Sequence, residues 1–260
     1  MTRGPGVTGG GTAGDSRGGT AGDSPGGIAR DPGRATRPGG REVPGGGSGT
    51  DGAAPEPPPA AAEVFGPALP AARRYGDLLA GPGVERGLIG PREVPRLWSR
   101  HLLNCAAIAG LVPHPATLID VGSGAGLPGV VLAVLLPDVS VTLLERMGRR
   151  ADFLRECVAA LGLANATVVQ AQASEMAGKL TADVVTARAV APLATLAPMT
   201  LRLTRPGGLV LAIKGTGAAA EVAAARPVLR RLRVREVGVI AAGGGKVDPA
   251  ATVVRLVAGT

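Results

Sequence analysis

A glycine-rich turn is the strongest chemical signal in this sequence. The residues Gly122-Ser123-Gly124-Ala125-Gly126 follow an apolar run, have the spacing GxGxG and begin two residues after Asp120. Glycines let the backbone approach a ligand closely, and in open α/β folds the ligand lies beyond the carboxyl end of the strand. A dinucleotide fingerprint would require glycine at position 127, where this chain has Leu127. The turn therefore favours a nucleoside with an amino-acid tail over a pyrophosphate.

A carboxylate completes this pattern. Glu145 ends the next apolar run, 141–145, and stands at the distance from the turn at which an acid accepts hydrogen bonds from both ribose hydroxyls. NAD-binding and adenosylmethionine-binding folds share such an acid, so it indicates a ribose without choosing between them. The alternative is a purely structural glycine turn, but the order strand, turn, helix, strand favours a nucleoside cofactor.

The elements around the turn alternate between strands and helices. Strands are expected at 117–121, 141–145, 167–169, 183–186 and 209–213, and helices at 130–136, 153–161 and 193–203, with Gly162 ending the second helix. This alternation predicts a doubly wound α/β fold with a mostly parallel sheet. Two further apolar runs, 234–240 and 252–257, have no convincing helix between them and are expected to pair antiparallel at one edge.

Composition divides the chain into three parts. Residues 1–62 contain 19 glycines and 9 prolines and almost no large apolar side chains, so this tail is expected to be disordered. Residues 63–115 have a helical pattern broken by glycine and proline, which predicts a small helical cap. Residues 116–260 form the predicted catalytic domain.

The net charge of +8 belongs to residues 63–260, which carry 22 basic and 14 acidic side chains. A positive domain suits a polyanionic partner such as nucleic acid, although charge also serves solubility.

Cys105 and Cys157 lie in apolar helical patterns typical of buried thiols, and no metal-ligand pattern is present. No apolar run is long enough to span a bilayer, so we expect no membrane segment and a cytoplasmic location. We also expect a monomer that binds no metal.

The chain resembles the small-subunit ribosomal RNA guanine-N7 methyltransferases, also called the glucose-inhibited division protein B family, over roughly residues 75–257. The Leu-Pro-Gly that follows the glycine turn is much more specific than GxGxG alone. The other segments that carry the resemblance are Arg100-His101-Leu102-Leu103, Leu143-Leu144-Glu145 followed by Arg149-Arg150 and Phe153-Leu154, Ala187-Arg188-Ala189 and Ile213-Lys214-Gly215.

This resemblance implies a class I (Rossmann-like) methyltransferase fold with seven strands, S-adenosyl-L-methionine as cofactor, and 16S ribosomal RNA or the small ribosomal subunit as partner. The acceptor would be N7 of guanine 527. Ser174 is a departure, because the family usually has glutamate there and the nearest acid is Glu175. The implied cofactor-binding residues are Gly122, Gly124, Gly126, Leu127, Glu145, Ala173, Ser174 and Arg188.

Two cations are the candidates for catalytic residues. Arg188 is expected to hold the cofactor carboxylate or a guanine edge, unless it forms a structural ion pair with an acid such as Asp183 or Glu145. Lys214 is expected to contact a substrate phosphate. Guanine N7 carries a lone pair and no proton, so its methylation needs no general base, in agreement with the absence of an Asn-Pro-Pro-Tyr motif.

RNA contacts are expected from the cap and from a basic cluster. Arg100 and His101 would approach the site from the cap, although a structural hydrogen bond is an equal alternative for His101. Arg230 and Arg231 belong to the densest basic cluster, within 226–235, which is either an RNA contact or a solvated face. Two other functions compete with methylation: a nucleotide-dependent oxidoreductase, which leaves Leu127 unexplained, and a non-catalytic RNA-binding protein, which leaves the complete cofactor loop unexplained.

Overall fold

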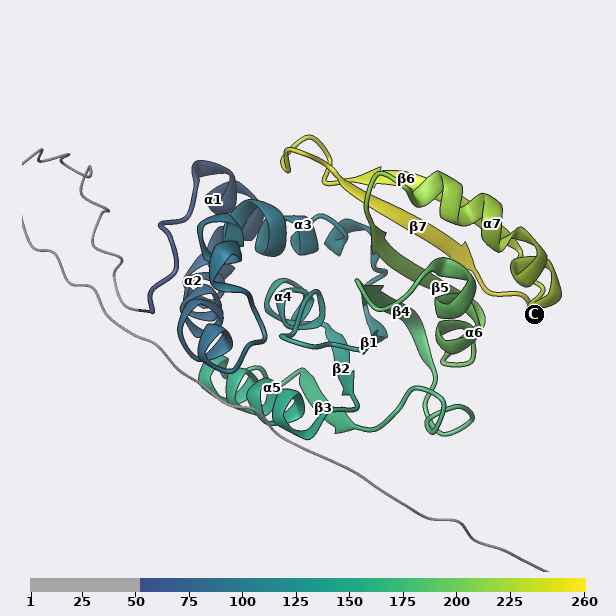
Figure 1. Cartoon of the computed structure of the whole chain (residues 1–260), viewed down its shortest axis with the longest axis horizontal. Helices are drawn as coiled ribbons and strands as arrows, with labels where there is room; N and C mark the ends of the chain where they lie inside the picture. The colour runs from purple at the N-terminus through teal and green to yellow at the C-terminus, as the bar shows by residue number, and fades with distance from the viewer. Residues whose placement is uncertain (1–51) are drawn as a thin grey trace, which may run out of the picture. The chain divides into compact units, whose positions relative to one another are not determined.

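The computed structural model describes residues 52–260, which form an α/β fold around one seven-stranded sheet (Figure 1). The strand order is β3-β2-β1-β4-β5-β7-β6. The predicted class I architecture, mostly parallel with an antiparallel edge, is confirmed. The strands are β1 (Ala116–Val121), β2 (Val139–Glu145), β3 (Ala166–Gln170), β4 (Ala182–Arg188), β5 (Thr204–Lys214), β6 (Glu236–Ala242) and β7 (Ala251–Val257).

The strand order reverses at β1, which pairs in parallel with β2 on one side and with β4 on the other. Ligands of open α/β sheets bind at such a reversal, beyond the carboxyl ends of the strands. The last two strands pair antiparallel as predicted, and β7 inserts between β5 and β6. The reversal at β1 therefore places the glycine turn at the expected ligand crevice.

Two helical layers cover the sheet (Figure 1). Because successive strand residues point to opposite faces, Leu118 packs into one core with the N-terminal helices, while Ile119 packs into a second core with the two helices that follow β4 and β5. Gly162 has φ +64° and ends α5, as predicted. The helices of the two layers are α4 (Gly129–Leu135) and α5 (Gly148–Leu161) on the first face, and α6 (Leu193–Leu201) and α7 (Ala218–Arg231) on the second.

Helix α7 was not among the predicted elements. Its buried side chains recur at helical spacing but two of them are only alanines, so the apolar stripe of Ala218, Val222, Ala225 and Leu229 is weak in the sequence. Strand β5 begins before the predicted strand at 209–213, and residues 205–208 form an irregularity inside it, where Gly207 has φ +74°. Both differences arise in segments with few large apolar residues.

The N-terminal cap is helical, and its structure begins before residue 63. The Trp98 indole N–H donates to the Pro55 carbonyl at 2.7 Å, and the Phe65 ring meets the Trp98 ring edge-on at 6.2 Å. The boundary predicted at residue 62 therefore falls inside α1, and residues 1–51 of the expected disordered tail lie outside the described residues. The cap comprises α1 (Pro59–Phe65), α2 (Leu69–Leu78) and α3 (Leu103–Ala106), joined by 3-10 turns at Gly66–Ala68, Pro91–Arg96 and Ala109–Leu111 and π-helical turns at Leu79–Gly83 and Leu97–Leu102.

Candidate active site

The glycine turn is fixed to the carboxyl end of β2. The Gly122 N–H donates to the Leu144 carbonyl at 2.8 Å, and Gly122 and Gly124 have φ of +69° and +59°. A side chain is strained in this left-handed region, which explains why glycine occupies both positions. A Cβ atom added at Gly122 would also lie 3.0 Å from Val190 of the loop after β4. The turn thus brings its bare backbone against the β4 loop.

Glu145 is buried at the end of β2 and faces the glycine turn. Its Oε2 accepts the Gly124 N–H at 2.9 Å, and its Oε1 accepts the Met147 N–H at 2.9 Å. A carboxylate has about four lone-pair positions, so two backbone donors leave acceptor capacity on both oxygens. A pair of adjacent hydroxyl groups, as in ribose, suits that remaining capacity.

A cavity of about 550 Å³ opens at this point. Its volume lies within the range of roughly 300–1,000 Å³ that is usual for small-molecule sites. Polar Glu145 lies on one side, and apolar side chains including Leu127 and Met199 lie around it. The combination of a bare glycine backbone, a buried carboxylate with free lone pairs and apolar walls fits an adenosine with a methionine tail. Of the sequence-predicted residues, the lining includes Gly122, Gly124, Leu127, Glu145, Ala173, Ser174, Arg188 and His101.

Gly126 does not line this cavity, contrary to the prediction that it binds cofactor. It is buried with φ +100°, and a Cβ atom there would lie 2.6 Å from both the Tyr75 hydroxyl and Val130. The Tyr75 hydroxyl donates to the Ala125 carbonyl at 2.7 Å. The third glycine therefore makes room for a cap side chain that holds the back of the turn.

Asp120 is completely buried behind the turn. Its Oδ2 accepts the Gly129 N–H at 3.0 Å, and its Oδ1 has no hydrogen-bond partner among the described residues. Burial raises the pKa of Asp120 to about 7. Its observed bond fixes the start of α4 rather than a ligand.

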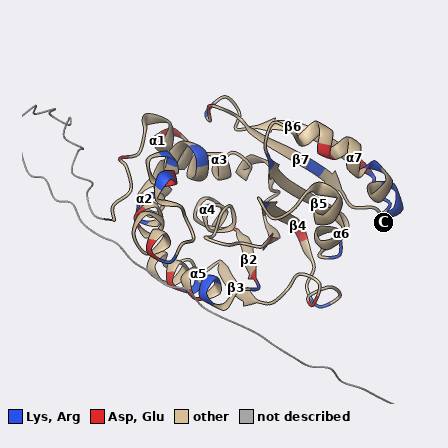
Figure 2. Cartoon of the chain, in the orientation of Figure 1, with Lys and Arg blue, Asp and Glu red and all other residues tan. Residues whose placement is uncertain are grey.

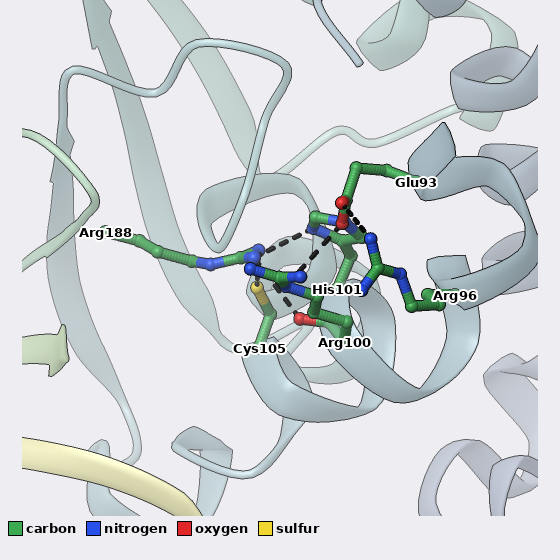
Figure 3. Close-up of polar contacts among 6 residues, drawn as sticks. All are labelled: Glu93, Arg96, Arg100, His101, Cys105 and Arg188. Carbon is green, nitrogen blue, oxygen red and sulfur yellow. Dashed lines mark hydrogen bonds and ion pairs between the residues drawn. The ribbon is translucent and has the colours of Figure 1, made fainter. Parts of the chain in front are cut away.

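Arg188, at the end of β4, reaches across to the cap (Figure 3). Its guanidinium donates to the Arg100 carbonyl at 3.2 Å and to the Cys105 sulfur at 3.3 Å, and lies 2.8 Å from His101 Nδ1. The alternative of an ion pair with Asp183 or Glu145 is wrong, because Asp183 pairs with Arg205 and Glu145 bonds to backbone. Arg188 joins the catalytic domain to the cap beside the cavity.

His101 is held between opposite charges. Its Nε2 lies 2.9 Å from Glu93 Oε2, while Nδ1 faces Arg188, which can only donate. The hydrogen bonds therefore assign the neutral tautomer with the proton on Nε2. Burial and the Arg188 charge lower the pKa of His101. With both ring nitrogens occupied, the geometry favours the structural alternative over RNA contact, whereas Arg100 is exposed beside Glu93.

Lys214, at the end of β5, is largely buried and already paired. Its ammonium donates to the Ala191 carbonyl at 2.7 Å and to Glu221 Oε2 at 2.7 Å. Two of its three N–H donors are thus used and its charge is balanced by Glu221. This arrangement is poorly suited to the predicted phosphate contact.

Arg230 and Arg231 are exposed in the last turn of α7. Basic residues gather at this end of the helix (Figure 2). Glu221, near the start of that helix, borders a cavity, and ten residues of helix span about 15 Å at 1.5 Å per residue. Neither arginine lines that cavity or the one at Glu145. Any RNA contact of theirs would lie outside the reaction centre.

Several residues that line the first cavity were not among the predicted site residues. Arg146 and Arg150 line the first cavity from the segment after β2, and Leu88 and Ile89 line it from the cap. Arg146 directly follows Glu145, and Arg150 belongs to the Arg149-Arg150 pair of the family resemblance, so both arginines had a signal in the sequence; nothing local marks the cap residues. Within residues 52–260, no group of three or more His, Cys, Asp or Glu side chains is arranged to hold a metal ion, and no helix is long and apolar enough to cross a membrane.

Comparison with known proteins gives concordant results. Residues 68–246 match the family GidB, described as rRNA small subunit methyltransferase G. Proteins named Ribosomal RNA small subunit methyltransferase G are similar over most of their length. The one from Thermobifida fusca is 60% identical over 77% of this chain and 84% of its own; those from Streptomyces avermitilis and Mycolicibacterium gilvum are 52% and 54% identical, over 79% and 77% of this chain and 87% and 89% of theirs.

Proposed function

The chain belongs to the rRNA small subunit methyltransferase G family, and from this premise we propose that it methylates N7 of one guanine in 16S ribosomal RNA, guanine 527 by family likeness. The observation that carries the proposal is the cavity lined by the glycine turn, Glu145 and Arg188. It joins a site for a nucleoside with an amino-acid tail to a cationic boundary where an acceptor can enter.

S-adenosyl-L-methionine supplies an electrophilic methyl group when bound. Glu145 would accept the ribose hydroxyls, and the bare backbone of Gly122 and Gly124 would leave room for the methionine tail. Ala173 and Ser174 would border the adenine. The acid usual at position 174 is absent, and Glu175 accepts the Gln172 N–H at 3.0 Å, so adenine recognition there would depend on backbone.

The chemistry of guanine N7 suits these side chains. The nitrogen attacks with an in-plane lone pair and has no proton to lose, so alignment and charge stabilisation replace base catalysis. His101 is bonded through both nitrogens and Asp120 is buried behind the turn, so neither is free to act as a base. Arg188, fixed by three contacts, would orient the cofactor carboxylate or the guanine edge.

Two other functions make different predictions. A nucleotide-dependent oxidoreductase would bind NAD, but Leu127 stands where the dinucleotide fingerprint has glycine. A non-catalytic RNA-binding protein would bind RNA without turnover, yet it would have no use for a cavity of about 550 Å³ at a complete glycine turn. Cofactor identity separates the first alternative from methylation, and methyl transfer separates the second.

A ribosomal RNA substrate implies action in the cytoplasm, and the proposed acting form is a monomer on 16S RNA or the small subunit. The test measures binding of S-adenosylmethionine and of NAD by calorimetry, and then transfer of labelled methyl groups to free 16S RNA and to small subunits that lack the modification. We expect binding of the first cofactor and transfer to at least one acceptor. Preferential binding of NAD, or cofactor binding without transfer to either acceptor, would contradict the proposal.

A further inference from the structure

A second cavity, of about 710 Å³, adjoins the first. The two cavities share Arg188, Ala189 and Val190, which form the boundary between them. The residues of the second cavity that can make polar contacts come from the cap and from the ends of β4, β5 and α7. They include Ser99, Arg100, Asn104, Arg188, Lys214 and Glu221.

Lys214 and Glu221 form a fixed pair of opposite charges in this second cavity. Glu221 Oε2 accepts from the Lys214 ammonium at 2.7 Å and from the Leu193 N–H at 2.8 Å, whereas Oε1 accepts no hydrogen bond from any described residue. The hydrogen bond from Lys214 lowers the pKa of Glu221, which keeps it ionised. The Lys214 ammonium has one N–H left after its bonds to Glu221 and Ala191.

The unused acceptor oxygen of Glu221 and the unused N–H of Lys214 match one edge of guanine. The Watson–Crick edge of guanine presents the O6 acceptor beside the N1–H and N2–H donors, and a carboxylate accepts from such donors while an ammonium donates to O6. Adenine would present an amino group to the ammonium and a lone pair to the carboxylate. The side chains of Lys214 and Glu221, which lie next to each other, therefore favour guanine over adenine.

We propose that the second cavity receives the target guanine, with Glu221 Oε1 accepting from N1–H and N2–H and Lys214 donating to O6. This inference rests on the proposed methylation of guanine N7. N2 and N7 lie at opposite ends of the purine, so a base read at Glu221 can direct N7 toward the shared boundary at Arg188, Ala189 and Val190 and the first cavity.

The same contact assists the reaction. Methyl transfer would form the bond from N7 to the methyl carbon while the bond from that carbon to the sulfonium sulfur breaks and leaves its electron pair on sulfur. The positive charge would thus pass to guanine, which makes N1–H and N2–H stronger donors. A fixed carboxylate on that edge binds the transition state more tightly than the neutral base, which is the requirement for catalysis. In addition to its ion pair with Lys214, Glu221 would therefore both select guanine and increase the rate of methyl transfer.

The test compares methylation of reconstituted small subunits that carry guanosine or inosine at the modified position. Inosine keeps O6, N1–H and N7 but lacks the N2 amino group. Because a hydrogen bond to a charged group contributes roughly tenfold to a hundredfold, the wild-type protein should prefer guanosine by about that factor in kcat/KM. Glu221→Met, which removes both acceptor oxygens at similar size, should reduce the preference to about one.

Three measurements keep the result decisive. Affinity for S-adenosylmethionine should be unchanged in Glu221→Met; if that variant does not fold, Glu221→Gln should still show a smaller preference than the wild type. Glu156→Gln, which removes the carboxylate of the exposed ion pair with Arg86, is the matched control and should keep the full preference. If the wild type shows no preference for guanosine over inosine, or if the Glu221 variants keep that preference, this inference is overturned and the proposed function is not. If no methyl group is transferred to guanosine at all, the proposed function is overturned.

Discussion

Substitution of Gly126 by alanine tests the arrangement of the turn against the cap. The added Cβ atom would lie 2.6 Å from the Tyr75 hydroxyl, 2.6 Å from Val130 and 3.2 Å from Leu154, at a φ of +100°. The left-handed backbone costs about 1–2 kcal/mol for a residue with a side chain. Overpacking in a filled core costs about 1–3 kcal/mol more. Gly126→Ala should therefore lower the free energy of unfolding by about 2–5 kcal/mol.

Gly124→Ala is the matched control, because it lies in the same turn with φ +59° and a Cβ atom there would have its nearest neighbour at 3.7 Å. Only the cost of the left-handed backbone applies here, so Gly124→Ala should lower the free energy of unfolding by about 1–2 kcal/mol. Urea unfolding of the two variants and the wild type measures the difference, and equal m-values validate the comparison. A loss at Gly126 no greater than that at Gly124 would refute the close packing of Tyr75 against the turn.

Three further predictions concern Glu145, His101 and the basic end of α7. Glu145→Gln should weaken S-adenosylmethionine binding about tenfold or more in calorimetry, because an amide cannot accept from both Gly124 and Met147 and also bind ribose; unchanged affinity would exclude Glu145 as the ribose ligand. Since the folded pKa of His101 lies below its ordinary value of 6.5, its contribution to stability is present above about pH 6.5 and is lost as pH falls through the folded pKa. Denaturant unfolding at about pH 7 and about pH 5 should therefore show a larger loss for wild type than for His101→Asn, and parallel losses would contradict the neutral tautomer. If Arg230 and Arg231 contact RNA phosphates, replacing both by alanine should reduce the slope of log affinity against log salt by about 2, whereas an unchanged slope would assign them to a solvated face.

Sequence alone predicted the features that local patterns determine. Apolar runs located the strands, Gly162 ended its helix, and the positions of Gly122, Gly124 and Glu145 predicted a cavity at the carboxyl ends of β1 and β2. These predictions succeed because backbone conformation at a tight turn and burial along a strand are set within a few residues.

Contacts between distant segments could not be predicted in the same way. Gly126 fits the GxGxG pattern, but its neighbour Tyr75 is fifty residues away from the Ala125 carbonyl that it binds. The partners of Arg188 lie 83 to 88 residues earlier in the chain, so its contact with the cap was hidden and an ion pair nearby was the natural alternative. Periodicity gives the face on which a side chain lies, not the partner that meets it there.

The chemical identity of the product tests the proposed methylation of guanine N7 without an intermediate inference. Small-subunit RNA that lacks the modification is incubated with the protein and S-adenosylmethionine labelled in the methyl group, then digested to nucleosides and separated by mass. We expect label in N7-methylguanosine at one position of 16S RNA. Label in another nucleoside, or no label in RNA while the cofactor binds, would contradict it.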